Sequence, residues 1–91
     1  MNLEWLDLSF NLISKIEGLE KLTKLSDLSV YSNRIEKLSG LETLTELNVF
    51  SFGQNLVKNL DESVQYLKGL KNKLEVLKMA DNPWVFASTN D

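Results

Sequence analysis

One pattern of leucines and asparagine occurs four times along this 91-residue chain. It runs Leu-x-x-Leu-x-Leu-x-x-Asn-x-Ile from Leu3, and it restarts 22 residues later at Leu25. Less regular copies start at Leu47 and Leu74. A sequence with such an internal period predicts a stack of similar units, each of which contacts only its neighbours. We therefore expect an extended presented surface rather than a pocket that carries chemistry.

The first half of each unit alternates between apolar and other residues. Leu6 and Leu8 would point to one side of the chain, and Trp5 and Asp7 to the other. This alternation predicts a short strand with one buried face. Because every unit repeats the same path, the strands are expected to be parallel. Their predicted positions are Leu6–Leu8, Leu28–Val30, Phe50–Phe52 and Leu77–Met79.

An asparagine follows each predicted strand, at the point where the chain must turn. Its amide can both donate to and accept from backbone groups, so a ladder of structural asparagines is expected inside the stack. These residues are Asn11, Asn33, Asn55 and Asn82. In the second half of the first two units, apolar residues recur every third position, which predicts a short helix or 3₁₀ segment against the strand. Gly18 and Gly40 precede this segment and are expected to supply backbone freedom.

The third unit is longer than the first two. Its pattern and that of the fourth unit start 27 residues apart, and the extra length carries apolar residues at helical spacing. We predict a regular α-helix around Glu62–Leu70. Asn59 or Asp61 would cap its start, and Gly69 suits its end.

The repeats make one domain of the α/β class, a solenoid with parallel strands on its concave face and short helices on its convex face. Its units lie near residues 3–24, 25–46, 47–73 and 74–86. Apolar residues reach both ends without a polar terminal unit. We expect the chain to be a fragment, an abbreviated product, or a chain whose ends other proteins cover. In isolation it should be marginally stable or self-associating.

The composition removes several kinds of function from consideration. The chain has no His and no Cys, and its four glycines are isolated rather than grouped in a phosphate-binding loop. We predict no enzyme activity, no catalytic residues, no metal and no cofactor. The net charge of −3 argues against nucleic acid as a partner. No apolar run approaches the roughly 20 residues that span a membrane, and no signal peptide is evident, so a cytoplasmic protein is expected.

The outward positions of the strands form the candidate binding surface. Large apolar side chains stand there where solvent would otherwise be, and Tyr and Trp are frequent anchors of protein interfaces. The predicted partner-binding residues are Trp5, the anchors Phe10 and Tyr31, the apolar floor of Val49 and Val76, and the orienting charges Asp27 and Lys78.

The pattern is the signature of leucine-rich repeats. Residues 3–46 resemble the 22-residue subclass typified by the regulatory subunit of protein phosphatase 1. A narrower resemblance is to the family of subunit 3 of the nexin–dynein regulatory complex in motile cilia. It is carried by the lengthened third unit and by Leu6-Asp7-Leu8-Ser9-Phe10-Asn11, Asp27-Leu28-Ser29-Val30-Tyr31-Ser32-Asn33-Arg34-Ile35, Gly53-Gln54-Asn55, Tyr66-Leu67 and the segment Leu74 to Pro83.

The narrower resemblance implies a scaffold of the ciliary axoneme that helps to link doublet microtubules and to regulate dynein. It implies location in the cytoskeleton of the cilium or flagellum, with other subunits of that complex or doublet microtubule proteins as partners. Members of this family also carry long coiled coils after the repeats, and the sequence shows none. The alternative is a regulatory subunit that binds a protein phosphatase or another enzyme through its concave face.

Overall fold

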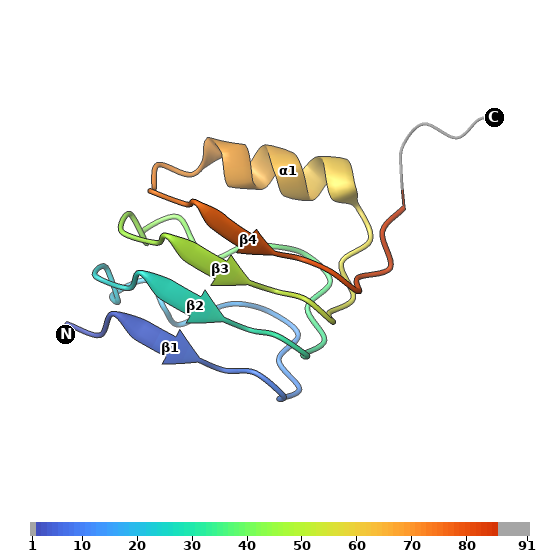
Figure 1. Ribbon diagram of the computed structural model, residues 1–91, viewed down its shortest axis with the longest axis horizontal. Helices are drawn as coiled ribbons and strands as arrows, with labels where there is room; N and C mark the ends of the chain where they lie inside the picture. Colours follow the sequence, from blue (N-terminus) through green and yellow to red (C-terminus); the bar gives the residue numbers. More distant parts are fainter. Residues whose placement is uncertain (1, 86–91) are drawn as a thin grey trace.

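A single parallel sheet organises the computed structural model of the protein, which describes residues 2–85. Its strands stand in chain order, as Figure 1 shows. They are β1 (Trp5–Asp7), β2 (Asp27–Ser29), β3 (Val49–Ser51) and β4 (Val76–Lys78). The repeats thus stack as the sequence predicts, in one α/β leucine-rich repeat solenoid. Residue 86, which ends the predicted fourth repeat, lies outside the described residues.

Each strand lies one residue earlier than the pattern suggested. Pairing begins before the predicted segment, because the carbonyl of Glu4 accepts from the N–H groups of Ser26 and Asp27 at 2.8 and 3.1 Å. The predicted inward side is correct, since Leu28 and Phe50 are fully buried and Leu6 packs against the core. The alternation therefore identified the buried face, while hydrogen bonding set the strand limits.

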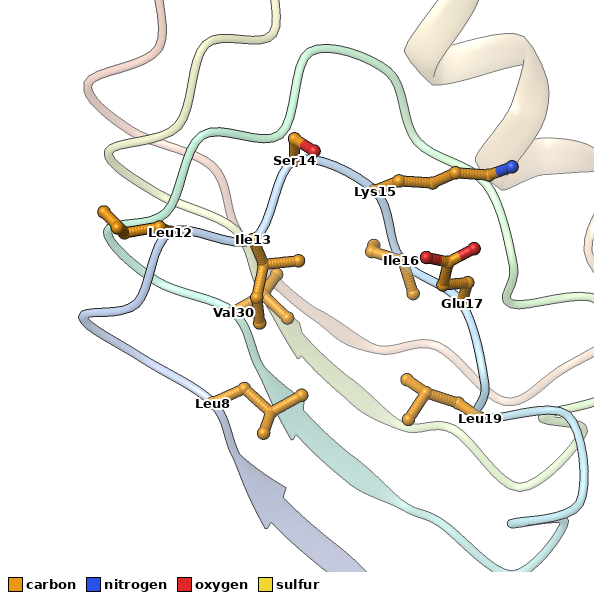
Figure 2. Close-up of a pocket in the computed structure, with 9 residues that line it drawn as sticks. All are labelled: Leu8, Leu12, Ile13, Ser14, Lys15, Ile16, Glu17, Leu19 and Val30. Atoms are coloured by element: carbon orange, nitrogen blue, oxygen red, sulfur yellow. The ribbon is translucent and has the colours of Figure 1, made fainter.

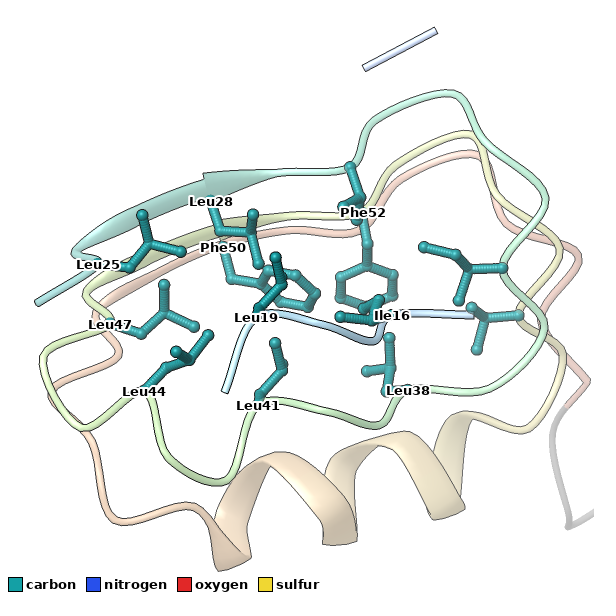
Figure 3. Close-up of a cluster of buried hydrophobic side chains, with 13 residues drawn as sticks. Ile16, Leu19, Leu25, Leu28, Leu38, Leu41, Leu44, Leu47, Phe50 and Phe52 are labelled. Atoms are coloured by element: carbon teal, nitrogen blue, oxygen red, sulfur yellow. The ribbon is translucent and has the colours of Figure 1, made fainter. Parts of the chain in front are cut away.

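The core lies between the sheet and a second layer formed by the returning chain (Figure 3). Phe50 and Phe52 take the places that leucines hold in the first unit, and their stacked rings lie 5.1 Å apart. Both side chains are fully buried. At the fourth unit the edge of Trp84 meets Phe52, with ring centroids 6.1 Å apart. The returning layer contributes Ile16, Leu19, Leu38, Leu41 and Leu44.

The predicted short helices of the first two repeats are absent, so that expectation is wrong. Each returning segment makes isolated turns: Leu22 N–H donates to Leu19 C=O, and Leu25 N–H to Leu22 C=O, both at 3.0 Å. A 3₁₀ helix would need such bonds from consecutive residues. An apolar residue at every third position fits both structures, so the spacing alone could not separate them.

The third repeat carries the one helix of the described chain, α1 (Leu60–Gly69), which lies across the core from the strands (Figure 3). It begins two residues earlier than predicted because Asn59 is its cap, with Glu62 N–H donating to Asn59 Oδ1 at 2.8 Å. It ends where Leu70 becomes extended. Gly69 closes the helix without the left-handed backbone of a glycine cap.

The asparagine ladder forms, and it ties each repeat to the one before it. Asn55 donates to the carbonyl of Val30 in the preceding repeat at 2.9 Å and accepts from Ile35 N–H at 2.9 Å. Asn33 and Asn82 make equivalent bonds. Asn11 differs: it is exposed and donates only within its own repeat, to Leu8 and Ser9. The ladder therefore holds three of its members inside the stack and leaves the first at the edge.

Candidate functional site

The face of the sheet that points away from the core presents the predicted binding residues in rows. In the first row, Trp5 aligns with Asp27, which aligns with Val49 and then with Val76. Adjacent members belong to paired strands and so lie about 4.8 Å apart along the row. Trp5 is 61% exposed and Val76 is 41% exposed, whereas Asp27 and Val49 are half-buried. We call this row the apolar row, although Asp27 interrupts it.

A second group lies at the other end of the strands, where the chain leaves the sheet. The rings of Phe10 and Tyr31 meet edge to face, with centroids 5.6 Å apart. Tyr31 also lies against Gly53 of the next repeat, where a Cβ atom would come within 3.2 Å of its ring. Tyr31 is half-buried by these contacts, and Phe10 is 75% exposed. We call Phe10, Tyr31 and Gly53 the aromatic corner.

The backbone at the aromatic corner is strained. Phe10 has φ +60°, and its equivalents Ser32, Gln54 and Asp81 have φ between +51° and +64°. The stack imposes this conformation, because Phe10 N–H donates to Tyr31 C=O at 2.9 Å, and Ser32 and Gln54 bond in the same way. A left-handed backbone is costly for a bulky residue. The exposed Phe10 side chain thus stands on a left-handed backbone, a conformation that suits a small residue better.

A polar row separates the apolar row from the aromatic corner. It consists of Asp7, Ser29, Ser51 and Lys78, which are aligned across the four strands. Ser9 hydrogen-bonds Ser29 through their hydroxyls at 2.8 Å, and its N–H donates to Asp7 Oδ1 at 2.9 Å. Hydrogen bonds from the Ser9 hydroxyl and then from its amide lower the pKa of Asp7. The carboxylate therefore stays charged at the first edge of the row, opposite the Lys78 ammonium at the last.

The structure thus divides the predicted set into two groups. Phe10 and Tyr31 are in contact, whereas Trp5, Asp27, Val49 and Val76 form a separate row. Lys78 belongs to the polar row between them. The period-2 pattern could not show this division, because it depends on where each strand ends.

Sequence reasoning missed two features. The first is the contact between Gly53 and the ring of Tyr31. In the sequence, its only signal was that Gly53 is the one glycine at a repeat position that Ser9, Tyr31 and Ala80 hold in the other units. The second is a cavity of about 400 Å³ beside β1, at the start of the solenoid, where Ser14, Lys15 and Glu17 also line it (Figure 2). Leu12, 72% exposed, stands at its rim. Its apolar walls are formed by Leu8, Leu12, Ile13, Ile16, Leu19 and Val30.

Among residues 2–85, no group of three or more acidic side chains gathers in a way that could hold a metal ion. In the same part of the chain, no helix is long and apolar enough to cross a membrane.

Comparison with known families supports the repeat architecture. A family model described as leucine rich repeats, in two copies, matches residues 2–43. A search of curated proteins found no match to the chain. The family match covers the first repeat and most of the second, which include the whole aromatic corner except Gly53.

Proposed function

Because this chain is a leucine-rich repeat solenoid, we propose that it holds a partner protein on the outward face of its sheet, with the aromatic corner as the anchor. Leucine-rich repeats generally mediate protein–protein binding and are typically scaffolds rather than enzymes. The observation that carries the proposal is the aromatic corner itself. Phe10 is exposed on a strained backbone and supports Tyr31, which in turn rests on a buried glycine.

The corner suits an apolar or aromatic side chain of the partner. The exposed face of Phe10 and the free part of the Tyr31 ring form a shelf, in which the Tyr31 ring is held between Phe10 and Gly53. A rigid aromatic anchor binds without losing much side-chain freedom, which is why Tyr and Trp dominate interface hot spots. The apolar row provides a second contact about 13 Å away, as expected for four residues of strand.

The size of the sheet sets the strength of this interaction. Four strands spaced about 4.8 Å apart give a face only about 14 Å wide between its outer strands. A stable interface needs about 800 Å² per partner. The face alone therefore supports weak binding, or binding within a larger assembly where other contacts add to it. Asp27 and Lys78, at different places on the face, orient the partner more than they strengthen its binding.

For the biological setting, we propose a structural and regulatory component of the ciliary axoneme, within the nexin–dynein regulatory complex. The support is the resemblance of residues 3–83, above all in the lengthened third repeat and the segment that includes Tyr31. Its partners are then other subunits of that complex or doublet microtubule proteins. A small face that binds within an assembly fits this role. The phosphatase-regulator alternative has the 22-residue period of residues 3–46 in its favour.

The test is capture of partners from extracts of cilia, with cross-linking to identify the contact. Tyr31→Ala removes the shelf, and partner capture should weaken about thirtyfold, as for a hot-spot residue worth about 2 kcal/mol. Lys78→Ala should change capture by less than about fivefold, since an exposed charge contributes less than about 1 kcal/mol. The control is charge reversal at Lys68, near the end of α1, and at Lys71, which follows α1.

Circular dichroism must show that each variant keeps the fold. The proposal fails if Tyr31→Ala captures as well as the parent while reversal at Lys68 and Lys71 abolishes capture. The binding face would then be that of α1. Labelling of proteins near the chain in ciliated cells separates the two settings. Enrichment of axonemal proteins supports the ciliary role, whereas enrichment of a phosphatase catalytic subunit supports the alternative.

A further inference from the structure

The two edges of the sheet carry complementary groups in the same register. The outward edge of β1 offers the Asp7 carbonyl. Its equivalents, the carbonyls of Ser29 and Ser51, accept from the preceding repeat at 2.8 Å inside the solenoid. The donors to those carbonyls are the N–H groups of Leu8 and Val30. Met79 holds the equivalent place after β4, so its N–H points outward from the last strand.

From this correspondence we propose that the protein associates head to tail with a second copy, whose β1 continues the parallel sheet beyond β4. Each neighbouring pair of repeats in the solenoid already uses this interface. At the new junction, Met79 N–H donates to the Asp7 carbonyl of the second copy, and the second copy's Glu4 N–H donates to the Glu75 carbonyl. Among the described residues, no strand pairs with the outward edge of β1 or of β4. Such an edge is a ready template for pairing with another chain.

The side chains at the two edges also match. Continuing the rows places Lys78 of one copy beside Asp7 of the other, so that opposite charges meet. The hydrogen bonds that lower the pKa of Asp7 keep its carboxylate charged for this contact. In the same way Val76 meets Trp5, and two exposed apolar side chains cover each other. Cross-strand pairs of both kinds stabilise sheets.

The cavity beside β1 has a filler at the opposite end. Trp84 stands two residues after Asn82, as Ile13 stands two residues after Asn11, and Ile13 lines the cavity. In a head-to-tail pair, the Trp84 indole comes to the cavity of about 400 Å³. One ladder bond is not reproduced at the junction. Inside the solenoid, the N–H at this place donates to the asparagine of the next repeat, as Ile35 N–H does to Asn55. Trp84 N–H instead donates to Asn82 C=O at 2.9 Å. Inside the solenoid, the returning chain of a neighbouring repeat would cover this place. The indole is larger than the isoleucine side chain and can fill the space instead.

A head-to-tail interface does not close on itself, so chains of increasing length are expected as the concentration rises. Two proline variants test this directly by removing one outward N–H each. Glu4→Pro blocks the β1 edge, and Met79→Pro blocks the β4 edge. Analytical ultracentrifugation should find the parent growing beyond a dimer from micromolar to millimolar concentration. Each proline variant alone should be a monomer, and an equimolar mixture should form a 1:1 dimer and nothing larger.

Glu4→Ala and Met79→Leu are the matched controls, since they alter the same side chains and keep the N–H. Both should associate as the parent does. The proposal is overturned if the parent remains a monomer or if the mixture of folded proline variants does not pair. It is also overturned if Met79→Pro alone forms dimers, which would mean that two β1 edges meet.

A second measurement does not depend on whether the proline variants fold. The chain has no cysteine, so introduced thiols report only their own contact. Asp7→Cys and Lys78→Cys lie on the exposed face, and in the proposed pair their Cα atoms are about 4.8 Å apart, which suits a disulfide. On mild oxidation the mixture should form a covalent dimer that contains one copy of each variant. Disulfide dimers of Asp7→Cys with itself, or none in the mixture, would refute the head-to-tail register.

Discussion

The ring of Tyr31 lies against Gly53 so closely that a Cβ atom at residue 53 would be 3.2 Å from the ring atoms Cδ1 and Cε1. The same Cβ would lie 3.1 Å from the carbonyl oxygen of Ala80 on the other side. The position of the main aromatic anchor therefore depends on the absence of a side chain one repeat further along the chain.

Gly53→Ala tests this dependence without removing the ring. The backbone at residue 53 is not left-handed, so any cost comes from the contact and not from backbone strain. We expect a loss of about 1–2 kcal/mol in the free energy of unfolding, as for other overpacked sites. Partner capture should fall by less than in Tyr31→Ala, because the ring is displaced and not removed. Urea unfolding and capture assays measure the two effects, and unchanged capture would show that the ring position is unimportant.

The asparagine ladder predicts unequal costs for one substitution at two places. Asn55→Ala leaves the buried N–H of Ile35 without an acceptor and removes one of the donors to each of three carbonyls, so we expect a loss of about 1–3 kcal/mol. Asn11→Ala removes only two local bonds of an exposed side chain and should cost less than about 0.5 kcal/mol. Chemical denaturation of both variants gives the comparison. Equal losses would argue against the structural role of the ladder.

Two glycines with the same backbone conformation differ in their surroundings. Gly18 and Gly40 both have φ +80°, so alanine at either position costs about 1–2 kcal/mol in strain. A Cβ at Gly18 meets open space, whereas one at Gly40 would collide with the carbonyl oxygen of Ile16. Gly40→Ala should therefore lower the melting temperature clearly more than Gly18→Ala. If calorimetry finds the two variants equal, the close contact between these repeats is not maintained in solution.

Tyr66 links α1 to the second repeat and makes the stability sensitive to alkaline pH. Its hydroxyl accepts from Leu41 N–H at 3.0 Å and donates to Glu42 Oε2 at 2.5 Å. Burial, and then the hydrogen bond to Glu42, raise the pKa of Tyr66 well above its ordinary value of 10.0. A phenol with a raised pKa stabilises the fold fully below pH 10.0, and this contribution is lost as the pH rises above that value.

Tyr66→Phe should therefore be less stable than the parent at neutral pH by about 1–2 kcal/mol, because Leu41 N–H loses its acceptor. Above pH 10 the difference between the two proteins should shrink. Urea unfolding at pH 7 and at pH 11 checks this. A difference that grows with pH would contradict the assignment of the Tyr66 proton.

Several features depended only on local spacing and were therefore predictable. The period of 22 residues placed the repeats, the alternation put Leu28 and Phe50 inside, and the lengthened third unit held its helix. These features follow from which side chains must leave water, and that choice is encoded along the chain itself.

The returning segments show where local spacing fails. An apolar residue at every third position buries the same side chains in a 3₁₀ helix and in isolated turns. The backbone hydrogen bonds decide between them. The bonds from Leu22 to Leu19 and from Leu25 to Leu22 come from residues three positions apart, whereas a 3₁₀ helix makes them from consecutive residues.

By itself, the sequence determined that this protein is a stack of repeats with aromatic side chains on its outward face. Only the tertiary structure decided that these side chains form two groups, that Tyr31 rests on Gly53, and that the two edges of the sheet match. The physical reason is that burial depends on the periodicity of one segment, whereas a surface depends on residues about 22 positions apart. Their register and separation are set by backbone hydrogen bonds between repeats, which no single segment contains.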